Sequence, residues 1–209
     1  MAKTKRLKSS FKIQRRLMCE LPGLGKPGAM DRRPYPPGQH GNTRRKFSDH
    51  SLQLIEKQKV LFHYGLREKQ LRHFIKRAKK GSGSNWTQKT ISLLESRLDN
   101  VLFRASFVSS IAAAKQLCSH RKVLVNGKIV DIRSAILKPG DVVSLKDSCY
   151  QNQVFMHAQS VKRLELPLHL EVTEKDSKPA ILVKDKPPGD ANPFPFNENL
   201  FTEYYSKRG

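Results

Sequence analysis

Residues 110–130 read SIAAAKQLCSHRKVLVNGKIV, and this stretch decides what kind of fold the chain adopts. Ser109 or Ser110 can cap a helix, because a hydroxyl there accepts a hydrogen bond from a free backbone N–H. The apolar side chains that follow fall on one helical face, at Ile111, Ala114, Leu117 and Cys118. Two short apolar runs, 123–125 and 128–130, then flank Asn126-Gly127, a dipeptide typical of a type I′ turn. We therefore predict a helix that leads directly into a β-hairpin.

The flanking sequence extends this unit on both sides. Apolar residues recur at helical spacing before it, at Ile91, Leu94, Leu98 and Val101. Pro139-Gly140 precedes another apolar run at 142–145, which predicts a further strand. Helices packed on a small antiparallel sheet bury one face of each element, so the sequence predicts a compact α+β module.

Two further helices are expected upstream. In the first, Ser48 or Asp49 can act as the cap, Leu52, Ile55 and Phe62 share a face, and the helix ends near Gly65. The second buries a stripe formed by Leu71, Phe74, Ile75 and Ala78. A flexible link at 81–84 follows.

The two ends of the chain are less regular. Residues 1–46 are basic and interrupted by Pro and Gly, which favours an extended arm over a packed domain. In the last third, residues 164–172 can contain a strand, and the apolar segment 200–205 is expected to dock on the body. The predicted organisation is an extended basic N-terminal arm (1–47), a helical subdomain (48–96), a domain built around the compact α+β module (97–160) and a C-terminal segment packed on the body (161–209).

The charge of the chain indicates an anionic partner. Lys and Arg number 40 against 18 Asp and Glu, giving a formal net charge of +22. Residues 1–46 hold 13 basic and 2 acidic residues, whereas residues 148–209 hold 8 of each. A surplus confined to one part of the chain is typical of a binding surface. A membrane-spanning protein is excluded, because no apolar run approaches the roughly 20 residues that a transmembrane helix needs.

The sequence gives little support for a catalytic site or a metal site. Residues 23–28, GLGKPG, match a dinucleotide-binding fingerprint in letters, but no buried strand precedes them and prolines follow. Three separated cysteines form neither a disulfide framework nor a zinc cluster. No nucleophile, base and acid can be placed together. We predict no catalytic residue, no metal and no cofactor.

Basic and polar side chains gather instead at the end of the central helix and on the hairpin beside it. A helix C-terminus attracts cations, so part of this cluster can be structural. An edge of helix and hairpin lined with Arg, Lys, His and Asn nevertheless suits the backbone and shape of folded RNA. We therefore expect nucleic-acid binding, with RNA favoured over DNA.

Several motifs resemble a known family. Residues 96–104 (SRLDNVLFR), 113–120 (AAKQLCSH) and 123–127 (VLVNG) resemble the αL RNA-binding motif. Residues 36–41 (PPGQHG), 54–59 (LIEKQK), 63–70 (HYGLREKQ) and 203–207 (EYYSK) are similar to the family of ribosomal protein four of the bacterial-type small subunit. The resemblance runs nearly from end to end.

The resemblance implies a structural component of the small ribosomal subunit that binds 16S-type rRNA directly. Such a protein nucleates assembly of the subunit body and contributes to translational accuracy. Its implied partners are ribosomal proteins five and twelve, and messenger RNA near the path by which it enters the ribosome. No membrane is involved, and the ribosome lies in bacterial cytoplasm or plastid stroma.

The motifs also imply which residues touch RNA. Carried over position by position, the expected contacts are Gln39, His40, Arg44, Arg45, Lys57, Lys59, Arg97, Asn100, Arg104, Lys115, Gln116, Ser119, His120, Arg121, Lys122, Asn126 and Lys128. Some family members carry a four-cysteine zinc site in the arm, but here only Cys19 lies in that region, so no metal is expected.

Two alternatives use the same motif. An RNA-modifying enzyme, such as a pseudouridine synthase, would need a separate catalytic domain, and residues 148–209 are too few and too rich in proline to build one. A free-standing αL module, active in ribosome rescue or as an RNA chaperone, would associate with ribosomes only loosely.

Overall fold

The computed structural model describes residues 9–31, 33–43, 46–80, 85–175 and 177–206. The chain forms two compact units, Met1–His63 with Phe194–Gly209, and Tyr64–Pro193. Each unit is described by itself. The predicted link at 81–84 and the candidate RNA contacts Arg44 and Arg45 lie outside the described residues.

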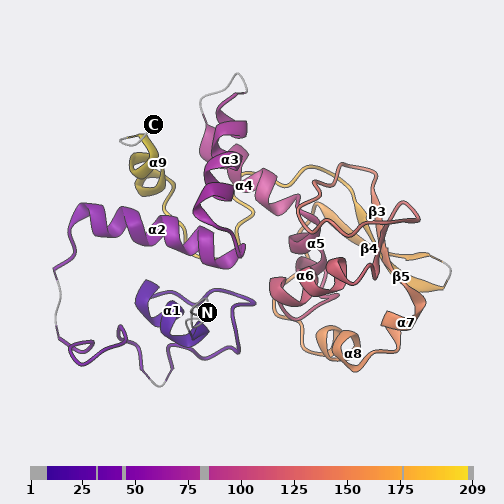
Figure 1. Ribbon diagram of the computed structural model, residues 1–209, viewed down its shortest axis with the longest axis horizontal. Coiled ribbons are helices and arrows are strands. Elements are labelled where there is room, and N and C mark those ends of the chain that lie inside the picture. Colours follow the sequence, from indigo (N-terminus) through magenta and orange to yellow (C-terminus); the bar gives the residue numbers. More distant parts are fainter. Residues whose placement is uncertain (1–8, 32, 44–45, 81–84, 176, 207–209) are drawn as a thin grey trace, which may run out of the picture. The chain divides into compact units, whose positions relative to one another are not determined.

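The larger unit has the predicted α+β fold. Its strands form one antiparallel sheet in the order β2-β1-β3-β5-β4 (Figure 1). Their bounds are β1 (Val123–Val125), β2 (Lys128–Ile129), β3 (Val142–Leu145), β4 (Leu170–Lys175) and β5 (Lys178–Val183).

The predicted hairpin is confirmed. Leu124 pairs with Ile129 and Val125 with Lys128, so Asn126 and Gly127 form the turn. Both turn residues have positive φ, 50° and 80°, as a type I′ turn requires. On its other side β1 pairs with β3, which places the predicted strand 142–145 in the centre of the sheet.

The C-terminal part of the chain differs from the prediction. Residues 161–209 do not simply pack on the body, because β4 and β5 belong to the same sheet as the hairpin, and Val143 of β3 pairs with Ile181 of β5. Strand β5 was not predicted, although Ala180, Ile181 and Val183 are buried in it. Its run Ala-Ile-Leu-Val is short and continuous, which is typical of a strand in the interior of a sheet.

Helices α5 (Leu98–Arg104) and α6 (Ile111–Ser119) lie side by side next to the sheet (Figure 1). The Ser110 hydroxyl accepts from the backbone N–H of Ala113 at 3.2 Å, so Ser110 is the cap. The two helices and the sheet share one core, which includes Val101, Phe107, Ile111, Ala114, Cys118, Val123, Val143, Leu145 and Ile181.

The helix expected over 91–101 is broken in two. Helix α4 (Trp86–Glu95) ends at Ser96, and α5 begins after Arg97, whose backbone is extended with φ −72° and ψ 142°. The predicted stripe survives the break, because Ile91, Leu94 and Leu98 are fully buried. Helix α3 (Glu68–Lys79) buries Leu71, Phe74, Ile75 and Ala78 as predicted.

A buried carboxylate lies at this break. Glu95 has no exposed surface, and its two carboxylate oxygens accept hydrogen bonds from the Tyr64 hydroxyl, Asn100 Nδ2 (2.9 Å) and Arg104 Nε (2.8 Å). Burial, followed by the charge of Glu95, raises the pKa of Tyr64 well above its usual range, so this phenol stays a neutral donor. Glu95 therefore joins α4, α5 and the segment before α3.

A second buried ion pair stands next to it. Arg97 binds Asp99 through both carboxylate oxygens, at 2.9 and 2.6 Å, and both side chains are 1% exposed. The Arg97 guanidinium also lies over the ring of Phe74, 5.6 Å from its centroid. The charged residues at the break thus satisfy one another inside the protein.

The smaller unit contains a helix where the sequence suggested only an extended arm. Helix α1 (Ser10–Leu17) buries Gln14 and Leu17. The Gln14 amide donates to the carbonyl of Leu24 (2.6 Å) and accepts from the N–H of Leu21 (2.9 Å), which folds the Pro- and Gly-rich turn back onto the helix. Polar contacts to the backbone hold this arm, so its low apolar content misled the prediction.

Helix α2 (Asp49–His63) forms at the predicted place but buries a different face. Its buried residues are Gln53, Glu56, Val60 and His63, whereas Leu52, expected inside, is 37% exposed. Helix α9 (Glu198–Ser206) packs along α2, and Gln53 Nε2 donates to Glu203 at 2.8 Å (Figure 1). The segment 200–205, which was predicted to dock on the body, thus packs on α2 within this unit.

No helix in the described part of the chain is long and apolar enough to cross a membrane.

His169, just before β4, is a buried titratable group. It is 4% exposed, and among the described residues its Nε2 has no hydrogen-bond partner. Burial, with a smaller contribution from Arg104, lowers the pKa of His169 from 6.5 to about 4. The folded protein therefore holds this imidazole neutral over a range of pH in which an unfolded chain protonates it.

Replacing Glu95 should lower the free energy of unfolding of the larger unit. Glu95→Ala leaves Arg104 buried without its carboxylate, so we expect a loss of about 3–5 kcal/mol in the free energy of unfolding, measured by urea denaturation. Glu68→Ala is the matched control, because its pair with Arg72 is exposed (3.2 Å), and it should cost about 1 kcal/mol or less. Equal losses in the two variants would contradict the structural role of Glu95.

His169 should make stability depend on pH. Because its folded pKa is lowered, the unfolded chain binds more protons between pH 6.5 and about 4, and stability falls as pH falls through this window, by up to about 3 kcal/mol. Urea denaturation of wild type and His169→Gln at pH 7.5 and 4.5 measures the difference. The wild type should lose more stability than the variant, and parallel losses would refute the assignment.

Candidate RNA interface

The end of α6 and the hairpin bring most of the central candidates together. Because α6 leads directly into β1, residues from the last helical turns and from the hairpin lie on adjacent elements. Lys115, Gln116, Ser119, His120, Arg121 and Lys128 are exposed and Lys122 is half-buried, and these seven residues are called the α6–hairpin surface below.

The turn between α6 and β1 sets the direction of this surface. Arg121 has a φ of 56°, in the left-handed region, and its N–H donates to the carbonyl of Cys118 at 2.8 Å. The N–H of Lys122 reaches back to Leu117 at 3.1 Å. These bonds satisfy the last free carbonyls of the helix and leave the Arg121 side chain outside.

The basic side chains of the α6–hairpin surface make only weak, exposed interactions within the protein. Arg121 Nε lies 3.2 Å from Asp131, but the two side chains are 70% and 47% exposed. Lys122 Nζ donates to the Ser148 hydroxyl at 3.1 Å. Exposed pairs of this kind contribute at most about 1 kcal/mol, so a phosphate can replace the partner.

Asn126 has a different role. Its Nδ2 donates to Asp141 at 2.8 Å, and its Oδ1 accepts from the N–H of Val142 at 2.9 Å. Both ends of the amide are therefore engaged in holding the turn. Asn126 shapes the α6–hairpin surface, although the sequence suggested a direct contact with RNA.

Arg97, Asn100 and Arg104 are not at the surface. They are 1%, 1% and 6% exposed, and they bind Asp99 or Glu95 inside the protein. Arg104 Nη2 also donates to the carbonyl of Ala191. This corrects their assignment as RNA contacts, because the basic side chains of the motif at 96–104 stabilise the break between α4 and α5.

In the smaller unit, Gln39 and His40 are exposed on a closed loop. The N–H of Gly41 donates to the carbonyl of Gly38 at 3.2 Å, and a Cβ at Gly41 would stand 1.9 Å from the Pro36 oxygen. No other residue fits at Gly41 without opening the loop. The loop therefore presents Gln39 and His40 in a fixed place.

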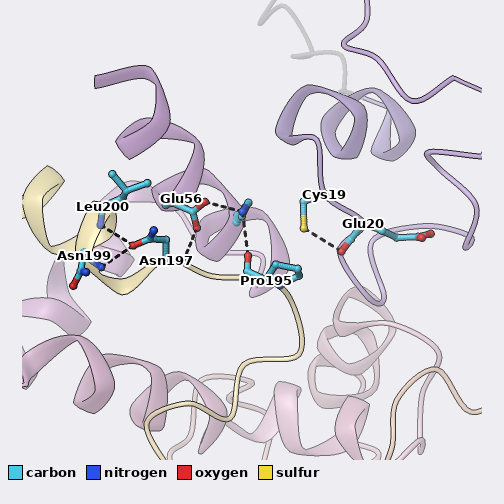
Figure 2. A network of polar contacts seen from close by, with 8 residues as sticks. Cys19, Glu20, Glu56, Pro195, Asn197, Asn199 and Leu200 are labelled. Carbon is cyan, nitrogen blue, oxygen red and sulfur yellow. Dashed lines mark hydrogen bonds and ion pairs between the residues drawn. The ribbon is translucent and has the colours of Figure 1, made fainter. Parts of the chain in front are cut away.

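Lys57 and Lys59 on α2 bind other parts of the same unit. Lys59 Nζ contacts Glu56 at 2.7 Å and the carbonyl of Pro195 at 3.0 Å, and its side chain is 11% exposed. Figure 2 shows the Glu56 carboxylate between this contact and the backbone of Asn197, whose N–H donates to it at 3.1 Å. Lys57 lies over the Tyr204 ring, 5.2 Å from its centroid. Lys59 thus anchors the chain after Phe194, which corrects its assignment as an RNA contact.

Lys138 is an exposed neighbour of the hairpin turn that the sequence analysis did not select. Asp141 accepts from Asn126 Nδ2 and from the N–H of Lys138 (2.7 Å), so one carboxylate joins the two turns. The signal available in the sequence was the turn sequence Lys138-Pro139-Gly140-Asp141, which stands directly before β3.

The site offers cations and hydrogen-bond donors and no activated nucleophile. Cys118 on α6 is buried, and burial raises its pKa to about 12. Burial also raises the pKa of Cys19. Within the described residues no three His, Cys, Asp or Glu side chains form a group that could hold a metal ion.

Comparison with protein families gives two matches that together cover most of the chain. Residues 5–95 match the family model described as the ribosomal protein S4/S9 N-terminal domain. Residues 96–143 match the S4 domain. The boundary between the two matches falls at the break between α4 and α5.

The chain is also similar over nearly its whole length to curated proteins of bacteria. It is 56% identical over 199 residues to small ribosomal subunit protein uS4B of Bdellovibrio bacteriovorus, covering 95% of this chain and 96% of that protein. It is 43% identical to uS4 of Methylobacillus flagellatus and 40% identical to uS4 of Parasynechococcus marenigrum, with the same coverage of both chains.

Proposed function

The chain belongs to the uS4 family of small-subunit ribosomal proteins, and from this premise we propose that it is an rRNA-binding structural component of the small ribosomal subunit. The family is structural and not enzymatic. The match to uS4B of Bdellovibrio bacteriovorus covers 95% of this chain and 96% of that protein, which also disfavours a free-standing αL module.

The observation that carries the proposal is the α6–hairpin surface. Its backbone runs from α6 through a hydrogen-bonded turn into the hairpin. Helix α6 and strand β1 bury side chains in one core and β2 pairs with β1, so the backbone of the surface is formed before RNA arrives. Rigid positioning lowers the cost of binding. The side chains are Lys, Arg, His, Gln and Ser, which donate hydrogen bonds to phosphate and sugar oxygens.

We extend the proposal to the finer role of the family. The RNA is the 16S-type rRNA, and binding nucleates assembly of the subunit body and supports translational accuracy. Ribosomal proteins five and twelve, and messenger RNA where it enters the ribosome, are the proposed neighbours. The proposed compartment is bacterial cytoplasm or plastid stroma.

Some of the remaining candidate residues stay in the proposal and others are left out. Gln39 and His40 are exposed and stay candidate contacts, and Lys57 is half-buried beside Tyr204. Arg44 and Arg45 follow the same loop in the sequence and are proposed with it. Arg97, Asn100, Arg104 and Lys59 are left out, because they are buried or nearly buried and paired within the protein.

Charge reversal on the α6–hairpin surface tests the proposal. Lys115→Glu/Arg121→Glu should bind small-subunit rRNA roughly 10- to 100-fold more weakly near 0.1 M salt, because two phosphate contacts are lost. The slope of log affinity against log salt should fall by about 1.4–1.8. Filter binding or calorimetry over a salt series measures both quantities.

The matched control is Lys162→Glu/Lys184→Glu, which makes the same change of charge at exposed lysines outside the surface. It should affect binding much less. Circular dichroism should show all variants folded, since none of these side chains is in the core. Normal binding by the Lys115/Arg121 variant, or equal losses in both, would remove the α6–hairpin surface from the proposal.

A further inference from the structure

The larger unit contains an open groove of about 590 Å³ away from the core. Its walls come from four parts of the chain: α3, α4, the loop 136–139 before β3, and the loop 186–189 after β5. It is called the α3–α4 groove below.

The charged residues that line this groove are all of one sign. Each wall contributes one basic side chain: Arg77 from α3, Lys89 from α4, Lys138 and Lys186 from the two loops. No Asp or Glu is among the lining residues. The four cations produce a region of positive potential. Because they come from four separate segments, this region does not correspond to any single run of basic residues in the sequence.

Two acidic side chains in the loops that carry Lys138 and Lys186 bind the backbone of those loops. Asp185 accepts from the N–H of Lys186 at 2.6 Å, and Asp141 accepts from the N–H of Lys138 at 2.7 Å. Both carboxylates thus hold the backbone that carries a groove cation. They fix the loops and stand outside the lining.

The walls are tied together by close packing and backbone bonds. A Cβ at Gly189 would lie 2.3 Å from the Cβ of Gln88, so the loop after β5 rests directly on α4. The N–H of Leu137 donates to the carbonyl of Ser96 at 2.9 Å, and Ile136 pairs with Arg97. The groove is therefore built into the fold and does not need RNA to form it.

The groove adjoins the α6–hairpin surface. Asp141 binds both Asn126 in the hairpin turn and the backbone of Lys138 at the edge of the groove. Lys138 therefore lies next to the hairpin turn.

We propose that the α3–α4 groove binds a sugar–phosphate backbone of rRNA and continues the path that begins on the α6–hairpin surface. This proposal rests on the proposed function. The polar residues Gln88 and Ser92 in the lining can donate to phosphate and 2′-hydroxyl oxygens. An acidic protein fits less well, because the described residues of the lining include no Trp or Tyr, two of the side chains that most often anchor protein interfaces.

The groove is tested with the full chain and small-subunit rRNA. Lys138→Gln/Lys186→Gln removes two exposed cations and should lower the salt slope by about 1.4–1.8 and the affinity roughly 10-fold or more near 0.1 M salt. The control Lys162→Gln/Lys184→Gln carries the same change of charge and should leave both nearly unchanged. Urea denaturation shows that the variants remain folded.

Footprinting then separates the groove from the α6–hairpin surface. Hydroxyl-radical cleavage should show that the Lys138/Lys186 variant loses protection at backbone positions adjacent to, and different from, those lost by Lys115→Glu/Arg121→Glu. If wild type does not bind rRNA, the proposed function itself fails. If wild type binds and the groove variant keeps its slope and its footprint, only the groove proposal is overturned. Loss of a ribosomal protein from reconstituted subunits, with an unchanged RNA footprint, would also overturn it, because the groove would then hold an acidic protein.

Discussion

The buried carboxylate of Glu95 is the interaction on which the larger unit depends. It binds a tyrosine that precedes α3 and an asparagine and an arginine from α5, and it has no contact with solvent. A charge in that position is stable only when its partners stay in place, so the break between α4 and α5 has one geometry. That break directs α5 and α6 onto the sheet. Helix α5, which begins at this break, packs against α6, the helix that carries part of the α6–hairpin surface.

This constraint also explains what the sequence could and could not predict. The hairpin, α3 and α6 were predictable because apolar spacing, a capping serine and Asn126-Gly127 all act locally. Arg97, Asn100 and Arg104 were misjudged because a basic or polar residue within a motif is ordinarily solvent-exposed. Their acidic partners, Asp99 and Glu95, are close in the sequence. Their burial, however, depends on segments that pack around them from elsewhere in the chain, such as the one that contains Ala191, and no local pattern contains that information. The same holds for Gln14 in α1 and for the polar face of α2.

Composition predicted the kind of partner better than the place where it binds. The charge surplus in the first two-thirds of the chain indicated an anionic ligand, yet some of those cations are used inside the fold. Arg77 comes from this part of the chain and Lys186 from the part without net charge, yet both line one groove. A count of charges along the chain does not separate basic residues that are paired inside the fold from those that are exposed. Only the fold sorts the basic side chains into those that stabilise the protein and those left available to RNA.

The smaller unit has a consequence for the order in which the protein takes shape during its own synthesis. Helix α2 is made early, but its buried polar face is completed by residues 194–206, through Gln53 with Glu203 and Lys59 with Pro195. The larger unit, lying between these segments in the chain, contains all the strands of its own sheet by residue 183. Domains usually fold in the order in which they leave the ribosome. Here the unit that begins to be translated first is the last to close, so a nascent chain carries its basic N-terminal region incomplete until residues 194–206 have been made.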